Sequence, residues 1–460
     1  MSVADELDRR DLHRGALTNL VGAGLKLADP VLLVAVAASY GPARFGLFYV
    51  AQAVVLLLLR VSLVGFDKAV LWWVPRERDR RPTPLLQRLV RPALCVAAVV
   101  VALVFAFADH APEVAATLRV MALSLPLLVV TELLTHATMG LRRMGVNIIV
   151  KDAVIPLAFP AFGLAFVALG RLEDGLGWAY LGSNAVGAVA AWVGYRVAFR
   201  DRADGAADPP GLFAYALPMW AAEVSNSMLQ RVDVLLVEAL TRDFALAGVW
   251  AVVLKLANAL RAIRRSFDPI VAAIAAEPAV SGARLRAVMT RASLMVSAVQ
   301  VPVVAILYVF GEPLLAAFGD GDFSGGTTPL LVLTTGWLIT STVGLTGVAL
   351  YARGHGRAHL LNTVVTLAAV VVVGVFAIPR WELVGAAVAV VSGAAVQALL
   401  QTVMLQRRTG VWGVSWTGLV PIAVGAAAAL PAQMVDGAAQ LAVFGGLYAL
   451  AVIPLIWRRG

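Results

Sequence analysis

The stretch that decides the fold reads Phe213-Ala-Tyr-Ala-Leu-Pro-Met-Trp-Ala-Ala-Glu223-Val-Ser-Asn226-Ser-Met-Leu-Gln230-Arg231-Val-Asp233-Val-Leu-Leu-Val-Glu238 and continues to Glu277. After a break at Thr241-Arg242-Asp243, its second half carries Lys255, Asn258, Arg261, Arg264, Arg265 and Asp268. Each half is long and apolar enough to cross a membrane as a helix. Because a charge at mid-bilayer costs roughly 2.5–3.5 kcal/mol, such side chains usually face a protein interior or a wet cavity.

The polar residues of both halves recur at helical spacing. The polar face of the first helix carries Glu223, Asn226, Gln230 and Asp233. The polar face of the second helix carries Lys255, Asn258, Arg261 and Arg265. Two helices with one polar face each predict the wall of a water-filled path.

The composition of the whole chain agrees with this membrane interpretation. Of its 460 residues, 60% are hydrophobic and 14% are charged, whereas soluble proteins contain about 45–50% apolar and about 25% charged residues. The only cysteine is Cys95, which excludes a disulfide framework and a cysteine-based metal site. We attribute the net charge of +9 to arginines that orient the helices in the membrane, and we expect no nucleic-acid partner.

The chain predicts an all-α polytopic membrane protein with about 14 transmembrane helices. The apolar segments are 15–38, 46–66, 92–108, 117–141, 146–170, 176–198, 212–240, 247–275, 289–310, 329–352, 358–378, 384–405, 417–434 and 441–457. Their connections alternate between a set with 24 Lys and Arg residues and a set with 4. Because cytoplasmic loops carry the excess of positive charge, we expect the first set and both termini to be cytoplasmic.

A faint internal repeat divides the helices into two lobes. The matching segments, offset by 201 to 203 residues, are Pro30–Val34 with Asp233–Val237, Ala43–Gly46 with Ala245–Gly248, and Gly65–Asp67 with Ser266–Asp268. We therefore expect two pseudo-symmetric six-helix lobes, with helices 1–6 in residues 1–200 and helices 7–12 in residues 201–405. Residues 406–460 would add a C-terminal helix pair. Lobes with an even number of spans are parallel repeats, as in alternating-access transporters.

Three motifs connect this pattern to a known family. They are Tyr40-Gly-Pro-Ala-Arg-Phe-Gly-Leu-Phe48, Gln230-Arg-Val-Asp-Val-Leu-Leu-Val237 and Ser266-Phe-Asp-Pro-Ile270. Together with the two lobes, they resemble the Wzx-type polysaccharide flippases of the multidrug/oligosaccharidyl-lipid/polysaccharide (MOP) superfamily. The resemblance implies alternating-access transfer of undecaprenyl-diphosphate-linked oligosaccharide across the bacterial inner membrane, for surface polysaccharide or O-antigen biosynthesis. It implies a transporter with no cofactor, not an enzyme.

Such a carrier needs a hydrated cationic cavity for the diphosphate and a lateral opening that leaves the polyprenyl tail in lipid. Arginine binds phosphate oxygens in a bidentate manner, and lysine acts as a point charge. The cations within spans that we expect to bind the substrate are Lys26, Arg60, Arg231, Lys255, Arg261, Arg264 and Arg265. The carboxylates that we expect to couple transport to H⁺ or Na⁺ are Asp29, Glu132, Glu223 and Asp233.

Some of these charges also have a structural interpretation. Neutralisation by a neighbour, or snorkelling to the inner membrane face, explains the pairs Lys26–Asp29, Asp67–Lys68 and Lys151–Asp152. Glu132 and His136, four residues apart, form either a proton relay or a satisfied interior pair. We do not expect His355 and His359 to bind a metal, because no carboxylate accompanies them.

Two other functions remain open from the sequence. A cation-coupled multidrug exporter of the same superfamily would favour acidic and aromatic residues in its cavity, whereas this chain has many deep cations. A membrane-embedded glycan polymerase or glycosyltransferase usually needs a large or carboxylate-rich outer loop. The largest outer connection, Gly311–Thr328, contains only Glu312, Asp320 and Asp322.

Overall fold

The computed structural model describes most of the chain. The described residues are 3–77, 79–141, 144–200, 202–205, 211–275, 281–319, 321, 323–342, 345–352, 356–413, 416–433 and 438–459. Within these ranges, only the backbone is described for residues 3–32, 269, 270, 273, 351, 352, 356, 357, 359, 416, 438 and 455–459. The chain forms two compact units, Met1–Met228 and Leu229–Gly460, and each unit is treated by itself.

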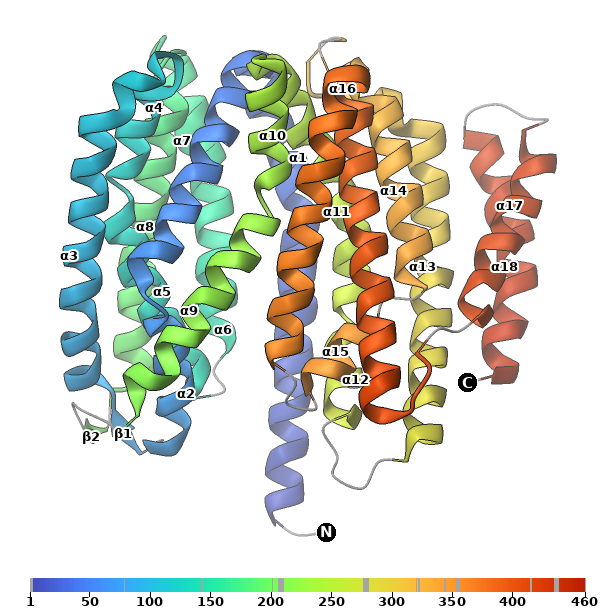
Figure 1. The fold of residues 1–460 in the computed structure, drawn as a ribbon, viewed down its shortest axis with the longest axis horizontal. Helices are drawn as coiled ribbons and strands as arrows, with labels where there is room; N and C mark the ends of the chain where they lie inside the picture. The colour runs from blue at the N-terminus through green and yellow to red at the C-terminus, as the bar shows by residue number, and fades with distance from the viewer. Residues whose placement is uncertain are drawn as a thin grey trace. The chain divides into compact units, whose positions relative to one another are not determined.

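The first unit is a bundle of helices with one small strand pair (Figure 1). Its elements are α1 (Val3–Leu63), α2 (Phe66–Trp73), the 3₁₀ turn Val74–Glu77, β1 (Arg80–Arg81), α3 (Thr83–Phe107), the 3₁₀ turn Ala108–His110, α4 (Pro112–Ala122), α5 (Leu125–Gly140), α6 (Met144–Ile148), the π-helical turn Ile149–Val154, α7 (Ile155–Ala168), α8 (Gly175–Ala198), β2 (Ala203–Asp204) and α9 (Leu212–Leu229). The strands β1 and β2 pair in parallel. Helix α5 packs against α2, α3 and α8, and therefore lies at the centre of this unit.

All regular elements among the described residues of the second unit are helices (Figure 1). Its elements are α10 (Val232–Thr241), α11 (Phe244–Arg265), α12 (Asp268–Ala275), α13 (Gly282–Ala316), the 3₁₀ turn Ser324–Gly326, α14 (Thr327–Ser341), α15 (Thr346–Ala352), α16 (Gly356–Thr409), the 3₁₀ turn Trp416–Leu419, α17 (Val420–Ala432) and α18 (Ala438–Arg459). Helix α16 packs against α10, α14 and α15, while α17 and α18 pack against α13.

The prediction of an all-α fold is confirmed, because the described parts of the predicted apolar segments are almost entirely helical and the strands described are two residues long. Two pairs of segments join into single long helices. The backbone of α1 leaves the helical region at Gly41 (φ 75°), between segments 15–38 and 46–66. The backbone of α16 does so at Glu382 (φ 47°), between segments 358–378 and 384–405.

Six described helical segments are long and apolar enough to cross a membrane, and the bent pair α4–α5 makes a seventh. The six are Leu33–Leu63, Thr83–His110, Met144–Ala168, Phe244–Arg265, Gly282–Ala316 and Leu360–Thr409. Other predicted spans are divided between shorter helices, such as 212–240 between α9 and α10. Many large apolar side chains, including Leu103 and Val189, are exposed on the helices, as expected of a surface that faces lipid.

Candidate functional site

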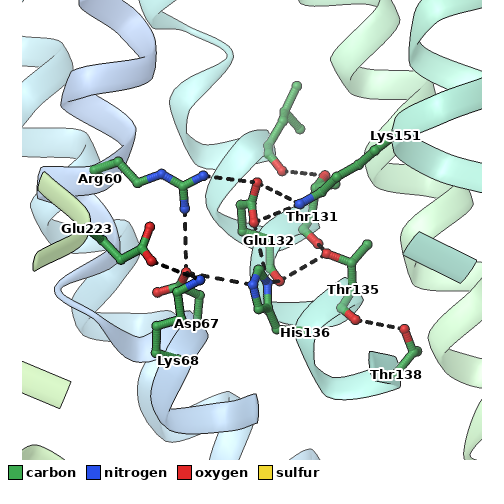
Figure 2. A network of polar contacts seen from close by, with 11 residues as sticks. Arg60, Asp67, Lys68, Thr131, Glu132, Thr135, His136, Thr138, Lys151 and Glu223 are labelled. Carbon is green, nitrogen blue, oxygen red and sulfur yellow. Dashed lines mark hydrogen bonds and ion pairs between the residues drawn. The ribbon is translucent and has the colours of Figure 1, made fainter. Parts of the chain in front are cut away.

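Seven titratable residues of the first unit form one connected group, which we call the charged network. It consists of Arg60, Asp67, Lys68, Glu132, His136, Lys151 and Glu223 (Figure 2). These side chains come from α1, α2, α5, the π-helical turn and α9. Asp67, Glu132 and His136 are buried, whereas the four outer members are half-buried.

A tight turn between α1 and α2 brings the first members together. Gly65 has a φ of 75°, a left-handed conformation that glycine adopts without strain. A Cβ atom on Gly65 would lie 2.2 Å from the backbone oxygen of Ala216, so only glycine allows α9 to approach the turn this closely. The turn also places Arg60 Nη1 3.4 Å from Asp67 Oδ2.

Glu132 is the centre of the network. Lys151 Nζ lies 2.9 Å from each of its carboxylate oxygens, and Arg60 Nη2 lies 4.0 Å from Oε1. Lys151 occupies the π-helical turn between α6 and α7, a geometry that is frequent at functional sites. Glu132 is therefore compensated by two cations, as a buried carboxylate requires.

His136 connects the two buried carboxylates (Figure 2). Its Nδ1 lies 2.8 Å from the backbone oxygen of Glu132 and 3.4 Å from Glu132 Oε2. Because a carbonyl oxygen only accepts, Nδ1 carries a proton, and Nε2 faces Asp67 Oδ2 at 3.8 Å. The spacing of four residues between Glu132 and His136 thus produces a direct contact.

Helix α9 is held to this network by side chains of its own. Lys68 Nζ lies 3.1 Å from Glu223 Oε1, and Trp220 Nε1 donates to the backbone oxygen of Arg60 at 3.1 Å. Both contacts join α9 to the α1–α2 corner.

The charges of the network balance, since three carboxylates face three permanent cations. Asp67, Glu132 and His136 each offer a ligand atom, and these atoms lie within 4.8 Å of one another. A metal ion there would have to displace Lys151, which already contacts both oxygens of Glu132. The arrangement therefore fits an ion-pair network that holds these helices together better than it fits a metal site.

The second unit contains a pocket of about 190 Å³, which we call the arginine pocket. Its charged lining residues are Asp233, Arg261, Arg264, Arg265 and Asp268. Three arginines and two aspartates give the lining a net charge of +1. Neutral polar residues complete the lining, among them Gln230, Thr340, Ser341, Thr366 and Gln397.

Helical periodicity explains the three arginines. Arg261, Arg264 and Arg265 are three and four residues apart on α11, and therefore share one face of the helix. The guanidinium of Arg261 lies 5.1 Å from the centre of the Trp337 ring, a cation–π contact that orients it. Asp233 is buried at the start of α10, and its Oδ1 accepts a hydrogen bond from Val234 N at 2.9 Å.

Some polar atoms of the lining are buried without a hydrogen-bond partner among the described residues. Asp268 Oδ1 and Thr366 Oγ1 are buried and form no hydrogen bond with the described part of the chain. Buried polar atoms in proteins are nearly always hydrogen-bonded, so such atoms point to a bound ligand or solvent. The arginine pocket therefore has unused hydrogen-bonding capacity as well as positive charge.

The structure thus divides the predicted site residues between the two units. Arg60, Glu132 and Glu223 belong to the charged network, and Asp233, Arg261, Arg264 and Arg265 line the arginine pocket. Among the described residues, neither Lys255 nor Arg231 lines that pocket, although both are half-buried. The side chains of Lys26 and Asp29 lie outside the described residues, as do those of His355 and His359.

Sequence comparison assigns the family. The family described as polysaccharide biosynthesis protein matches residues 12–276, more than half of the chain. The chain belongs to the polysaccharide biosynthesis protein family. No curated protein sequence matches it.

Solved structures show that this polysaccharide biosynthesis protein has the fold of MOP-superfamily transporters. One similar structure is the lipid II flippase MurJ in an inward closed conformation, with a TM-score of 0.71, 10% identity, and coverage of 96% of this chain and 98% of that chain. Another is an inward-facing multidrug resistance MATE family transporter, with a TM-score of 0.64, 14% identity, and coverage of 84% and 98%. A MOP transporter from Pyrococcus furiosus matches with a TM-score of 0.56, 14% identity, and coverage of 87% and 95%.

Proposed function

We propose that this protein flips a polyprenyl-diphosphate-linked oligosaccharide between the leaflets of the bacterial inner membrane by alternating access. The observation that carries the proposal is the arginine pocket, in which three guanidinium groups from one helix face line a common space. The family, polysaccharide biosynthesis protein, and the MOP transporter fold support transport of such a substrate. Both termini would lie in the cytoplasm, as the distribution of Lys and Arg predicts.

The proposed ligand of the arginine pocket is the diphosphate. Arginine pairs with phosphate oxygens through two parallel hydrogen bonds, and such charge-assisted bonds are about twice as strong as neutral ones. The volume of about 190 Å³ is smaller than the roughly 300–1,000 Å³ of pockets that enclose a drug-sized ligand. The pocket therefore suits the charged headgroup, and the glycan would extend beyond it.

The charged network has a different proposed role. Arg60 was predicted to face the substrate, and such contact would require it to leave Asp67 or Glu132. We propose that the network instead holds α9 to the α1–α2 corner while transport proceeds. For coupling to H⁺ or Na⁺ we propose Asp233, because this buried carboxylate lines the same pocket as the arginines.

Export of cationic drugs is the alternative within the same superfamily. The lining of the arginine pocket carries a net positive charge, which would repel a cationic drug. A drug exporter should lower the accumulation of a cationic dye in cells, whereas the proposed flippase should leave it unchanged.

Complementation of a flippase-deficient bacterial strain tests the proposal. Wild-type protein should restore surface polysaccharide, provided that the strain makes a glycan that this protein accepts. Arg261→Gln should lower export about tenfold or more, because a lost charge-assisted hydrogen bond costs about 1.5–3 kcal/mol. Arg380→Gln, which alters an exposed arginine of α16, is the matched control and should retain export. Normal export by Arg261→Gln at equal membrane abundance would refute the assignment.

A further inference from the structure

A second cavity lies in the first unit, at the end of the bundle where α3 begins and α8 ends. It has a volume of about 440 Å³, more than twice that of the arginine pocket. Its lining residues come from α3 and α8, together with Leu134 of α5 and with Arg81 and Asp204 of the strand pair β1–β2. We call it the basic cavity.

The polar side of the basic cavity carries two arginines. Arg81 donates through Nη2 to the backbone oxygen of Arg200, and its buried Nε forms no hydrogen bond with the described residues. Arg196 is exposed, and its guanidinium lies 5.1 Å from the centre of the Trp192 ring. Both side chains line the cavity, so their remaining donors can be offered to one ligand.

Two hydroxyl groups add to this polar side. Thr83 Oγ1 and Tyr195 Oη lie 2.9 Å apart, and both residues line the cavity. In such a pair one hydroxyl donates to the other, and the accepting hydroxyl keeps its own hydrogen for a ligand oxygen.

The balance of charge favours an anion. Asp204 is the acidic lining residue, against Arg81 and Arg196. Helix α3 also carries Arg88 and Arg91, which are not among the residues that line the cavity. Strand β1 also contains Arg80, and the described residues that flank the two strands in the sequence include Arg200 and Arg202, with Glu77 and Asp79 as acids.

The other side of the basic cavity is apolar. Leu86, Val90 and Phe199 line it, together with the exposed ring of Trp192. From Trp192, the exposed apolar side chains of Val189 and Val193 continue along α8. A ligand of this cavity would meet positive charge at one end and a hydrocarbon-like surface at the other. That pattern matches a lipid with an anionic headgroup.

The place of the cavity in the chain supports the same ligand. Most of its lining residues belong to segments 67–91 and 196–210. These segments are two of the Arg-rich connections that the distribution of Lys and Arg predicts to be cytoplasmic. Anionic lipids of a cytoplasmic leaflet attract basic segments next to the membrane by about 1 kcal/mol per residue. Tryptophan is also enriched at membrane–water interfaces, where Trp192 would lie.

We propose that the basic cavity binds an anionic phospholipid, with the headgroup phosphate held by Arg81 and Arg196 and an acyl chain lying along Trp192 and α8. This site is independent of the arginine pocket and of the proposed transport. The bound lipid would fix the β1–β2 connection to the membrane surface.

Fluorescence quenching of Trp192 by brominated lipids tests this proposal. The full-length protein is placed in phosphatidylcholine vesicles that contain either brominated phosphatidylglycerol or brominated phosphatidylcholine. The signal of Trp192 is the difference between wild type and Trp192→Phe, a substitution of an exposed side chain. Two arginines that contribute about 1 kcal/mol each should raise the affinity of the site for the anionic lipid about thirtyfold over the neutral lipid. Quenching of this signal by a low fraction of the anionic lipid should therefore clearly exceed quenching by the same fraction of the neutral lipid.

Two double variants distinguish a specific lipid-binding site from nonspecific attraction of anionic lipids to the basic loops. Arg81→Gln/Arg196→Gln should reduce the ratio of the two quenching effects to about one. Arg88→Gln/Arg91→Gln removes the same charge from exposed positions of α3 outside the cavity lining, and should retain the preference. If the double variant folds poorly, the single variant Arg196→Gln, at an exposed position, can be measured in its place. It should show a ratio between those of the wild type and the double variant.

Three results would overturn the proposal. Equal quenching by both lipids in the wild type would show that there is no preference for an anionic headgroup. Equal loss of preference in both double variants would show that the loops attract anions without a site. Loss of the preference on adding sodium phosphate, but not sodium chloride of the same ionic strength, would identify the ligand as soluble phosphate.

Discussion

The charged network and the arginine pocket contain similar charged residues but differ in how far these charges are balanced. In the network, three cations face three carboxylates, and Glu132 is contacted on both oxygens. In the pocket, three arginines face two aspartates, and Asp268 keeps a buried oxygen without a partner in the described residues. Charged side chains that pair fully with one another stabilise the fold. An excess of positive charge with unused hydrogen-bonding groups is instead available to bind a ligand. A buried charge therefore identifies a site only after its partners are known.

Among the tests of this comparison, we expect the largest loss of stability from Glu132→Ala. Removing one partner of a buried ion pair costs about 3–5 kcal/mol, because Lys151 and Arg60 would lose their buried counter-charge. The melting temperature of the protein in detergent should fall strongly.

Glu173→Ala is the matched control for that change. Glu173 is exposed and pairs with Arg44 at 2.6 Å, and exposed pairs contribute about 1 kcal/mol or less. Equal melting temperatures for the two variants would show that the charged network does not stabilise the first unit.

A smaller loss of stability is expected from Gly65→Ala. The left-handed conformation costs about 1–2 kcal/mol for a residue with a Cβ atom, and the contact with Ala216 adds a further displacement of α9. Gly170→Ala is the control, because Gly170 has a φ of 72° and open space at the Cβ position. Thermal unfolding should therefore show a greater loss for Gly65→Ala. A loss no greater than in the control would mean that α9 does not depend on this close approach.

The smallest effect concerns Lys68 and Glu223, which lie 3.1 Å apart with both side chains partly exposed. We expect a coupling free energy of about 0.5–1 kcal/mol from a double-mutant cycle with Lys68→Ala and Glu223→Ala. The cycle should be measured by chemical unfolding of purified protein. Strict additivity would remove this pair from the contacts that hold α9.

The helices could be predicted from the sequence because each apolar segment carries its own signal. Arg261, Arg264 and Arg265 could also be grouped, since helical spacing alone places them on one face. Glu132 and His136 were recognised in the same way, four residues apart on α5.

Contacts between residues that are far apart in the sequence could not be predicted from any local pattern. Lys151 pairs with Glu132 across 19 residues, and Lys68 pairs with Glu223, so both lysines were interpreted as neighbours of the membrane surface. The partners of Arg60 were hidden for a related reason, because its contact with Asp67 depends on the left-handed turn at Gly65. The basic cavity was missed because Arg81 and Arg196 belong to two connections far apart in the chain.

Binding of undecaprenyl diphosphate to the purified protein, measured by native mass spectrometry, tests the central comparison most directly. Arg261→Gln should weaken binding about tenfold or more while the melting temperature changes little. Arg60→Gln should lower the melting temperature while binding to the folded protein is retained. Loss of binding in Arg60→Gln together with unchanged binding in Arg261→Gln would contradict the assignment of the two clusters.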